Sequence, residues 1–137
     1  CFGGPFLPLH PLRYADLLSQ KIRDHKAKVY LVNTGWSGAT ASSGAKRISL
    51  KATRAMIHAI LRGEVDALPM KTDPIFGVLY PQYIDGVEGL TLDPVQAWLS
   101  PEEYLTQAND LAQRFQDNFK QYGAEVEHLI SQGPQRT

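Results

Sequence analysis

The sequence predicts a mixed α/β fold that is rich in helix, in a chain of 137 residues whose length suits one domain. Apolar residues recur at helical spacing in several segments, which indicates amphipathic helices. Residues 29–32 are instead four consecutive β-forming residues, a pattern typical of a strand that is covered on both faces. Hydrophobic residues make up 43% of the chain and charged residues 20%, and this composition excludes disordered and collagen-like proteins.

The first half of the chain contains two predicted helices and the predicted strand. The first helix follows Pro11, and its apolar stripe consists of Tyr14, Leu17, Leu18 and Ile22. The strand is expected at 28–33, and a loop rich in Gly, Ser and Thr follows at 34–44. Residues 46–50 are either a short strand or the start of the second helix, and Gly63 is the expected C-terminal cap of that helix. Its apolar positions are Leu50, Thr53, Ile57, Ile60 and Leu61.

The second half begins with turns and ends with helices. Proline and glycine interrupt short apolar runs over 64–99, which predicts turns and short extended pieces. Ser100, Pro101 and Glu103 form the N-cap, first position and capping-box glutamate of a long helix. The apolar stripe of this helix is predicted to be core and consists of Tyr104, Ala108, Leu111, Phe115, Phe119 and Tyr122. A last short helix is expected at 124–132.

The charges cancel overall but are separated along the chain. The chain has 14 Lys and Arg against 14 Asp and Glu. Residues 25–63 contain seven basic and no acidic residues, whereas 64–137 contain four basic and twelve acidic residues. The zero balance argues against a surface built for nucleic acid or anionic membrane. No apolar run reaches the roughly 20 residues that a membrane span needs, so neither nucleic acid nor membrane is an expected partner.

The basic segment has features that suit an anion. Over 29–54 the predicted strand leads into the Gly-rich loop and then a basic helix start, where backbone N–H groups, the helix dipole and cationic side chains attract negative charge. A solvated loop beside a basic helix face explains the same residues without a ligand. The loop is not a Walker A motif, because Gly38 and Gly44 are six positions apart and Ala45 follows the second glycine. Trp36, within the loop, either stacks on a base or covers the end of the sheet.

Neither a metal site nor a catalytic residue is predicted. No two of the four histidines lie at ligand spacing from one another, and they are His10, His25, His58 and His128. Cys1 has no base beside it, so a thiol nucleophile is not expected. As the single cysteine it excludes an intrachain disulfide and fits a reducing compartment. Because the chain opens on Cys1 in an apolar run rather than on Met, we expect it to be the interior of a longer chain.

Four stretches resemble the C-terminal portion of the ATP-dependent phosphoenolpyruvate carboxykinase family, in the same order. They are CFGGPFLPLHPLRYADLL, VYLVNTGWSG, KRISLKATRAMIHAIL and DPIFGVLYP. NTGW followed by a Gly-rich loop and KRISLKATR is the most specific part. The resemblance covers essentially the whole chain, so residues 1–137 are expected to be the C-terminal part of that family's nucleotide-binding domain, without the upstream part.

The resemblance implies an activity and a set of contacts. The family converts oxaloacetate and ATP to phosphoenolpyruvate, ADP and carbon dioxide in the cytoplasm, an entry step of gluconeogenesis. It uses Mg²⁺ with ATP and a second divalent ion, commonly Mn²⁺. Its adenine-nucleotide contacts fall on Arg47, Ile48 and Thr53. Its phosphate-binding loop, metal ligands and oxaloacetate-binding arginine match nothing in this chain, so we expect the chain to need the missing N-terminal part and to be inactive alone.

Three positions depart from the resemblance and leave alternatives open. Ala45 stands where the family usually has Gly, which restricts the loop if that position needs a positive φ. Val95 and Gln96 stand where the family usually has Arg and Asn. These losses motivate a second hypothesis, a non-catalytic binding or interaction module derived from the same domain. A third is a structural α/β domain that binds no ligand.

Overall fold

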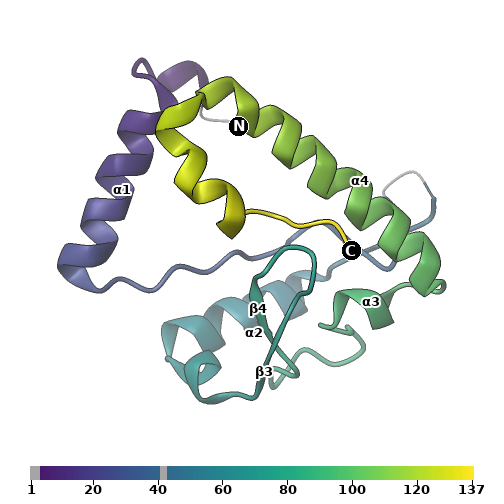
Figure 1. The fold of residues 1–137 in the computed structure, drawn as a ribbon. Helices are drawn as coiled ribbons and strands as arrows, with labels where there is room; N and C mark the ends of the chain where they lie inside the picture. The colour runs from purple at the N-terminus through teal and green to yellow at the C-terminus, as the bar shows by residue number, and fades with distance from the viewer. Residues whose placement is uncertain (1–3, 41–42) are drawn as a thin grey trace. The chain divides into compact units, whose positions relative to one another are not determined.

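The structure is a computed structural model that describes residues 4–40 and 43–137. The chain divides into two compact units, Cys1–Leu31 and Val32–Thr137, and Figure 1 shows the elements of each. The prediction made for Cys1, and the part of the predicted loop at 41–42, lie outside the described residues.

The first unit contains a short 3-10 helix, η1 (Gly4–Phe6), and the helix α1 (Pro11–His25). The helix begins at the predicted proline, and the imidazole of His10 accepts a hydrogen bond of 3.4 Å from the Leu12 N–H. Lys26 ends the helix in the left-handed conformation, with φ 50°. The predicted helix is therefore confirmed, although none of its residues is buried.

The predicted strand at 28–33 is wrong. These residues belong to no strand, and the side chains of Val29 and Leu31 are 63% and 88% exposed. A strand of this composition needs hydrogen-bonding neighbours and elements that cover its faces. Among the described residues no other segment pairs with it, so the apolar run stays outside any sheet.

The second unit begins with a small antiparallel hairpin. Strand β1 (Trp36–Ser37) pairs with β2 (Lys46–Arg47), with Trp36 opposite Arg47. Helix α2 (Leu50–Leu61) follows directly, and the Ser49 hydroxyl caps it by accepting from the Ala52 N–H at 3.1 Å. Both alternatives for 46–50 are thus realised in succession, first a strand and then a helix start.

The buried face of α2 differs from the predicted one. The structure buries Ala52, Met56 and Ala59, whereas Leu50 and Leu61 are 74% and 79% exposed. The small alanines allow a close approach of the segment around Val87, which joins Ala52 and Met56 in one apolar cluster. Residues packed at the edge of this cluster are Ile48, Ala55, Ile84, Leu90 and Leu92.

Turns and short elements dominate 64–99, as predicted. The elements of this region are η2 (Glu64–Ala67), β3 (Met70–Thr72), β4 (Leu79–Pro81) and α3 (Pro94–Ala97). Strands β3 and β4 pair antiparallel, with Thr72 opposite Leu79. The turn between β3 and β4 is built on Asp73, whose carboxylate accepts from the N–H groups of Ile75 and Phe76 at 2.9 and 2.7 Å.

Helix α4 (Pro101–Phe119) is the longest element and starts where the capping residues predict. The Ser100 hydroxyl accepts from the Glu103 N–H at 3.2 Å. The helix buries Tyr104, Ala108 and Ala112, which form the main core cluster together with Ile75 of the turn between β3 and β4. The predicted core stripe is wrong at Leu111 and Phe115, which are exposed because no element of the described residues covers them. Phe119 and Tyr122, at the end of the stripe, are partly buried.

The chain ends beside α4. Two 3-10 helices, η3 (Lys120–Tyr122) and η4 (Ala124–Gln132), reverse its direction, and the tail then runs along α4 (Figure 1). The Gln135 N–H donates to the Ile75 carbonyl at 2.7 Å, and Thr137 exchanges two hydrogen bonds with the Asn109 amide. The short helix predicted at 124–132 is therefore present, in 3-10 form.

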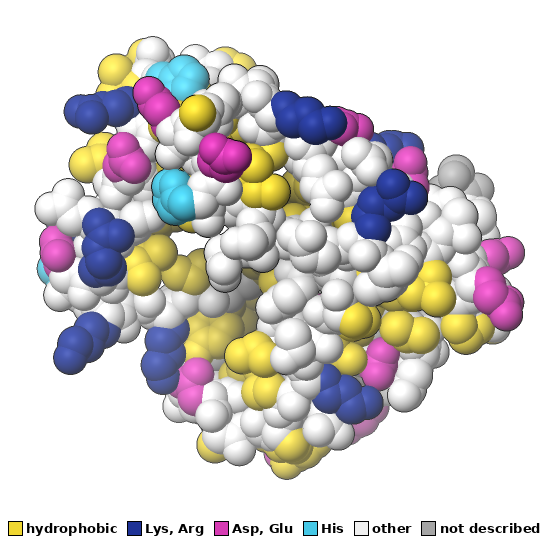
Figure 2. Space-filling model, in the orientation of Figure 1, with side chains coloured by type: hydrophobic (Ala, Val, Ile, Leu, Met, Phe, Trp, Pro, Cys, Tyr) yellow, Lys and Arg dark blue, Asp and Glu magenta, His cyan; other side chains and the backbone are white. Residues whose placement is uncertain are grey.

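These elements make a helix-rich fold with two small antiparallel sheets, which is compatible with the predicted mixed α/β class. In the described ranges, no helix combines the length and apolar character needed to cross a bilayer. Apolar side chains reach the surface in several places on the face seen in Figure 2.

Candidate functional site

The NTGW stretch folds as a turn that leads into the β1–β2 hairpin. The Asn33 side-chain oxygen accepts from the Gly35 N–H at 2.9 Å, and its amide nitrogen donates to the Trp36 carbonyl at 3.1 Å. The Gly35 carbonyl accepts from the Ile48 N–H at 2.9 Å. An asparagine that hydrogen-bonds the backbone two residues ahead is a recurrent turn device. The motif therefore fixes the backbone on both sides of Trp36.

The two glycines that flank the hairpin loop have positive φ, 87° at Gly38 and 86° at Gly44. A Cβ atom on Gly38 would lie 2.8 Å from the carbonyl oxygen of Ala97, so the hairpin approaches α3 closely there. Among the described residues Lys26 is the single non-glycine with positive φ. Ala45 therefore occupies an ordinary backbone conformation, and an alanine at this position introduces no strain.

Arg47 lies on β2 with an exposed side chain, and its guanidinium carbon sits over the Trp36 ring, 5.5 Å from the ring centroid. This distance is within the range of a cation–π contact. The Trp36 side chain is 48% exposed, so the pair is at the surface. The ring of Trp36 therefore packs on a side chain of the paired strand, and both alternatives for it, stacking on a base and covering the end of the sheet, stay predictions.

The other two predicted contacts follow Arg47 in the same segment. Ile48 packs against the apolar cluster of Ala52, Met56 and Val87. Thr53 is partly buried on α2, and its N–H donates to the Ser49 carbonyl in the first turn. The side chain of Arg47 thus contacts Trp36, whereas that of Ile48 packs against the cluster on α2, so these two side chains have different neighbours.

The same segment carries positive charge at its surface. Lys46, Lys51 and Arg54 are all exposed. Lys51 forms an ion pair of 3.4 Å with Glu88, and both side chains are almost fully in water. Because an exposed pair of this kind is weak, it leaves most of the local positive potential in place. The start of α2 adds the positive end of its helix dipole.

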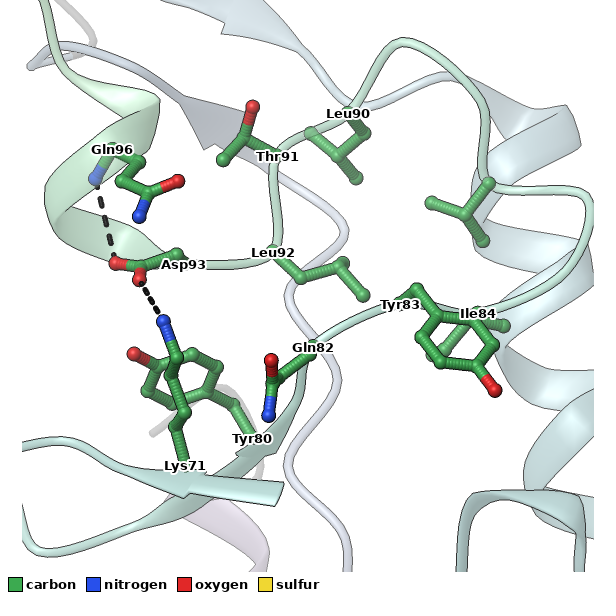
Figure 3. Close-up of a pocket in the computed structure, with 11 residues that line it drawn as sticks. Lys71, Tyr80, Gln82, Tyr83, Ile84, Leu90, Thr91, Leu92, Asp93 and Gln96 are labelled. Carbon is green, nitrogen blue, oxygen red and sulfur yellow. Dashed lines mark hydrogen bonds and ion pairs between the residues drawn. The ribbon is translucent and has the colours of Figure 1, made fainter. Parts of the chain in front are cut away.

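A second feature is a pocket of about 240 Å³ between the β3–β4 hairpin, the 82–92 segment and α3 (Figure 3). Its polar wall centres on Asp93, whose carboxylate pairs with Lys71 Nζ at 3.3 Å and accepts from the N–H groups of Val95 and Gln96 at 3.1 and 3.4 Å. Figure 3 shows Tyr80 beside this ion pair. The sequence carries no motif for the pocket, because its residues are spread over three elements.

The electrostatics of the pocket follow from burial and the ion pair. Partial burial acts to raise the pKa of Asp93, but the hydrogen bonds from Lys71 and the α3 backbone outweigh it and hold the pKa below its ordinary value. Partial burial, together with the negative charge of Asp93, raises the pKa of Tyr80. At neutral pH the carboxylate of Asp93 is therefore ionised and the phenol of Tyr80 is protonated.

Two departures from the family resemblance lie at this pocket or behind it. Val95 packs against the core cluster of Ile75 and Tyr104, and Gln96 lines the pocket (Figure 3).

No group of three His, Cys, Asp or Glu side chains able to hold a metal occurs within 4–40 and 43–137. The described residues therefore offer no ligand set for the divalent ions that the resemblance implies.

Comparison with known proteins gives a consistent result. Residues 1–89 match the family model described as phosphoenolpyruvate carboxykinase. Two proteins from Staphylococcus aureus, strains MRSA252 and Newman, are 46% and 45% identical to this chain over 133 residues. Both are named phosphoenolpyruvate carboxykinase (ATP). The match covers 97% of this chain and 25% of each relative, so the chain spans a quarter of the length of the curated relatives that it matches.

Proposed function

Because the chain belongs to the phosphoenolpyruvate carboxykinase family, we propose that it is the nucleotide-contacting, C-terminal part of an enzyme that converts oxaloacetate and ATP to phosphoenolpyruvate, ADP and carbon dioxide. The names of the relatives support ATP as the phosphoryl donor. The proposal includes the family's setting, gluconeogenesis in the cytoplasm. It also includes a partner, the N-terminal part of the same enzyme, which the fourfold greater length of the relatives supports.

The observation that carries the proposal is the cationic surface of the β1–β2 hairpin beside the start of α2. Arg47 would contact the nucleotide through a planar guanidinium, a group that suits both phosphate oxygens and ring nitrogens. Ile48 would form an apolar wall next to the adenine, and Thr53 would offer a hydroxyl. All three residues lie in one segment of nine residues with four cations, Lys46, Arg47, Lys51 and Arg54.

The chemistry itself is proposed to need groups outside this chain. Loss of carbon dioxide from oxaloacetate leaves an enolate whose oxygen attacks the γ-phosphorus of ATP, and the bond to the β-bridging oxygen breaks to release ADP. Phosphoryl transfer of this kind depends on a phosphate cradle and positioned cations. This chain's part is then to bind and orient the nucleotide.

A chimeric enzyme tests the proposal. In it, this chain replaces the 133-residue segment that it matches in the Staphylococcus aureus relative. We expect phosphoenolpyruvate to form from oxaloacetate and ATP, because the segment supplies the same contacts. A folded but inactive chimera would favour the non-catalytic module. Restored activity on changing Val95→Arg and Gln96→Asn would then assign the loss to those two positions, whereas continued inactivity would contradict the carboxykinase role.

A further inference from the structure

We propose that Trp36 is a positioning residue, which holds the Arg47 guanidinium in the orientation that meets the nucleotide. This inference rests on the proposed role of Arg47. The two residues face each other directly across the β1–β2 ladder, and the guanidinium carbon is 5.5 Å from the ring centroid. The indole thus supplies a platform for a side chain that is otherwise exposed to water.

The platform is fixed through its backbone rather than by burial of its ring. Asn33 bonds to both Gly35 and Trp36, and Gly35 in turn accepts from Ile48, the residue that follows Arg47. On the other side, Gly38 lies against the Ala97 carbonyl of α3. These contacts fix the backbone that carries the indole, while Trp36 is 48% exposed. An exposed tryptophan leaves apolar surface in contact with water and so contributes little to stability. We therefore attribute to its ring face a role in holding the Arg47 guanidinium.

The advantage to binding is entropic and geometric. A free arginine side chain loses rotamer freedom when it engages a ligand, and holding it beforehand lowers that cost. The guanidinium has no acceptor and several N–H donors in a rigid fork. A cation–π contact uses its charge and leaves those donors available to the phosphate oxygens or ring nitrogens of a nucleotide. The positioned arginine would therefore affect ATP binding more than turnover.

Steady-state kinetics of the chimeric enzyme test this inference through four variants, Trp36→Leu, Trp36→Phe, Arg47→Ala and the Trp36→Leu/Arg47→Ala double variant. Trp36→Leu is expected to raise the KM for ATP about twofold to fivefold, the range that corresponds to an exposed cation–π contact. The kcat and the KM for oxaloacetate should change little. Trp36→Phe keeps an aromatic ring and should therefore retain most of the wild-type affinity for ATP. The double variant should be no worse than Arg47→Ala, because Trp36 acts through Arg47.

Each alternative outcome of these kinetics would contradict one specific part of the inference or of the proposed function. If the effects of Trp36→Leu and Arg47→Ala multiply in the double variant, Trp36 acts on ATP independently of Arg47 and is not its positioning residue. If Trp36→Leu leaves the KM for ATP unchanged while Arg47→Ala raises it, the inference fails and the proposed function stands. If Arg47→Ala itself leaves that KM unchanged, the role of Arg47 fails, and with it the inference.

A spectroscopic measurement on the chain alone tests the contact without activity. Trp98, the second tryptophan, packs against Tyr104 with ring centroids 6.0 Å apart. In a Trp98→Phe background the emission reports Trp36 alone. Arg47→Ala is then expected to shift the wavelength or intensity of this emission, whereas Lys46→Ala, one residue away on the same strand, should not. An emission that Arg47→Ala leaves unchanged would contradict the contact in solution.

Discussion

The phenolic hydroxyl of Tyr104 donates a hydrogen bond of 3.0 Å to Asp73, a carboxylate that is 2% exposed. Asp73 also accepts from the N–H groups of Ile75 and Phe76 and so organises the turn between β3 and β4. Tyr104 thereby ties α4 to that turn at the centre of the main core cluster. Burial, followed by the negative charge and hydrogen bond of Asp73, raises the pKa of Tyr104 well above its ordinary value.

Replacing Tyr104→Phe should lower the stability of the chain and change its response to alkali. At neutral pH the buried carboxylate loses one donor, which costs about 1–3 kcal/mol. Above about pH 10 the unfolded chain releases its phenol proton while folded Tyr104 keeps its own, so native stability falls as pH rises. In Tyr104→Phe this part of the decline should be absent.

Urea titrations of both proteins from neutral pH to beyond the ordinary tyrosine pKa measure this difference. Tyr83→Phe, at an exposed tyrosine, is the matched control and should retain the alkaline decline. Equal slopes of stability against pH in the wild type and Tyr104→Phe would contradict the assignment to Tyr104.

Substitution of Gly38→Ala should destabilise the chain more than Gly44→Ala. Both glycines have φ near the same positive value, so each alanine incurs the left-handed penalty of about 1–2 kcal/mol. Only Gly38 has a backbone oxygen 2.8 Å from the Cβ that would be added, whereas Gly44 has no atom within 4 Å of it. Thermal unfolding of the two variants isolates the contact with Ala97, and equal losses would show that the hairpin does not press on α3.

Acid should weaken the chain in part through Asp93. Because its pKa is held below the ordinary value, Asp93 contributes stability that is fully present above about pH 4 and is lost as pH falls through the folded pKa. Asp93→Asn keeps an acceptor for the N-cap of α3 but removes the ion pair with Lys71. We expect it to cost about 0.5–1 kcal/mol at neutral pH, since water screens the half-exposed Lys71.

Denaturant midpoints measured from neutral to acid pH check this expectation. The difference in stability between Asp93→Asn and the wild type should become smaller as pH falls. Asp93→Ala also removes the N-cap acceptor, which adds about 0.5–2 kcal/mol. A gap that stays constant with pH would contradict the assigned role of the charge.

Local signals in the sequence predict the helix ends correctly. Ser100 and Gly63 act within one turn of their own position, so their neighbours in sequence contain all the information needed. The positions of the turns around Asp73 follow for the same reason.

The faces that are buried could not be predicted in this way. Helix α2 buries Ala52 and Met56 instead of Leu50 because the segment around Val87 packs there, and spacing within the helix does not show which segment that is. The strand expected at 28–33 fails because pairing requires neighbours distant in sequence. The pocket at Asp93 and the pairing of Trp36 with Arg47 likewise depend on contacts between separate elements.

The contribution of Arg47 to ATP binding is the central claim, and the KM for ATP of the Arg47→Ala chimeric enzyme tests it most directly. The KM for ATP should rise about tenfold or more, as expected for the loss of a charge-assisted contact, while the KM for oxaloacetate stays near that of the parent chimera. Arg114→Ala, which removes an exposed arginine paired with Asp110 on α4, should change neither value. An unchanged KM for ATP in Arg47→Ala, or an equal rise for both substrates, would contradict the account.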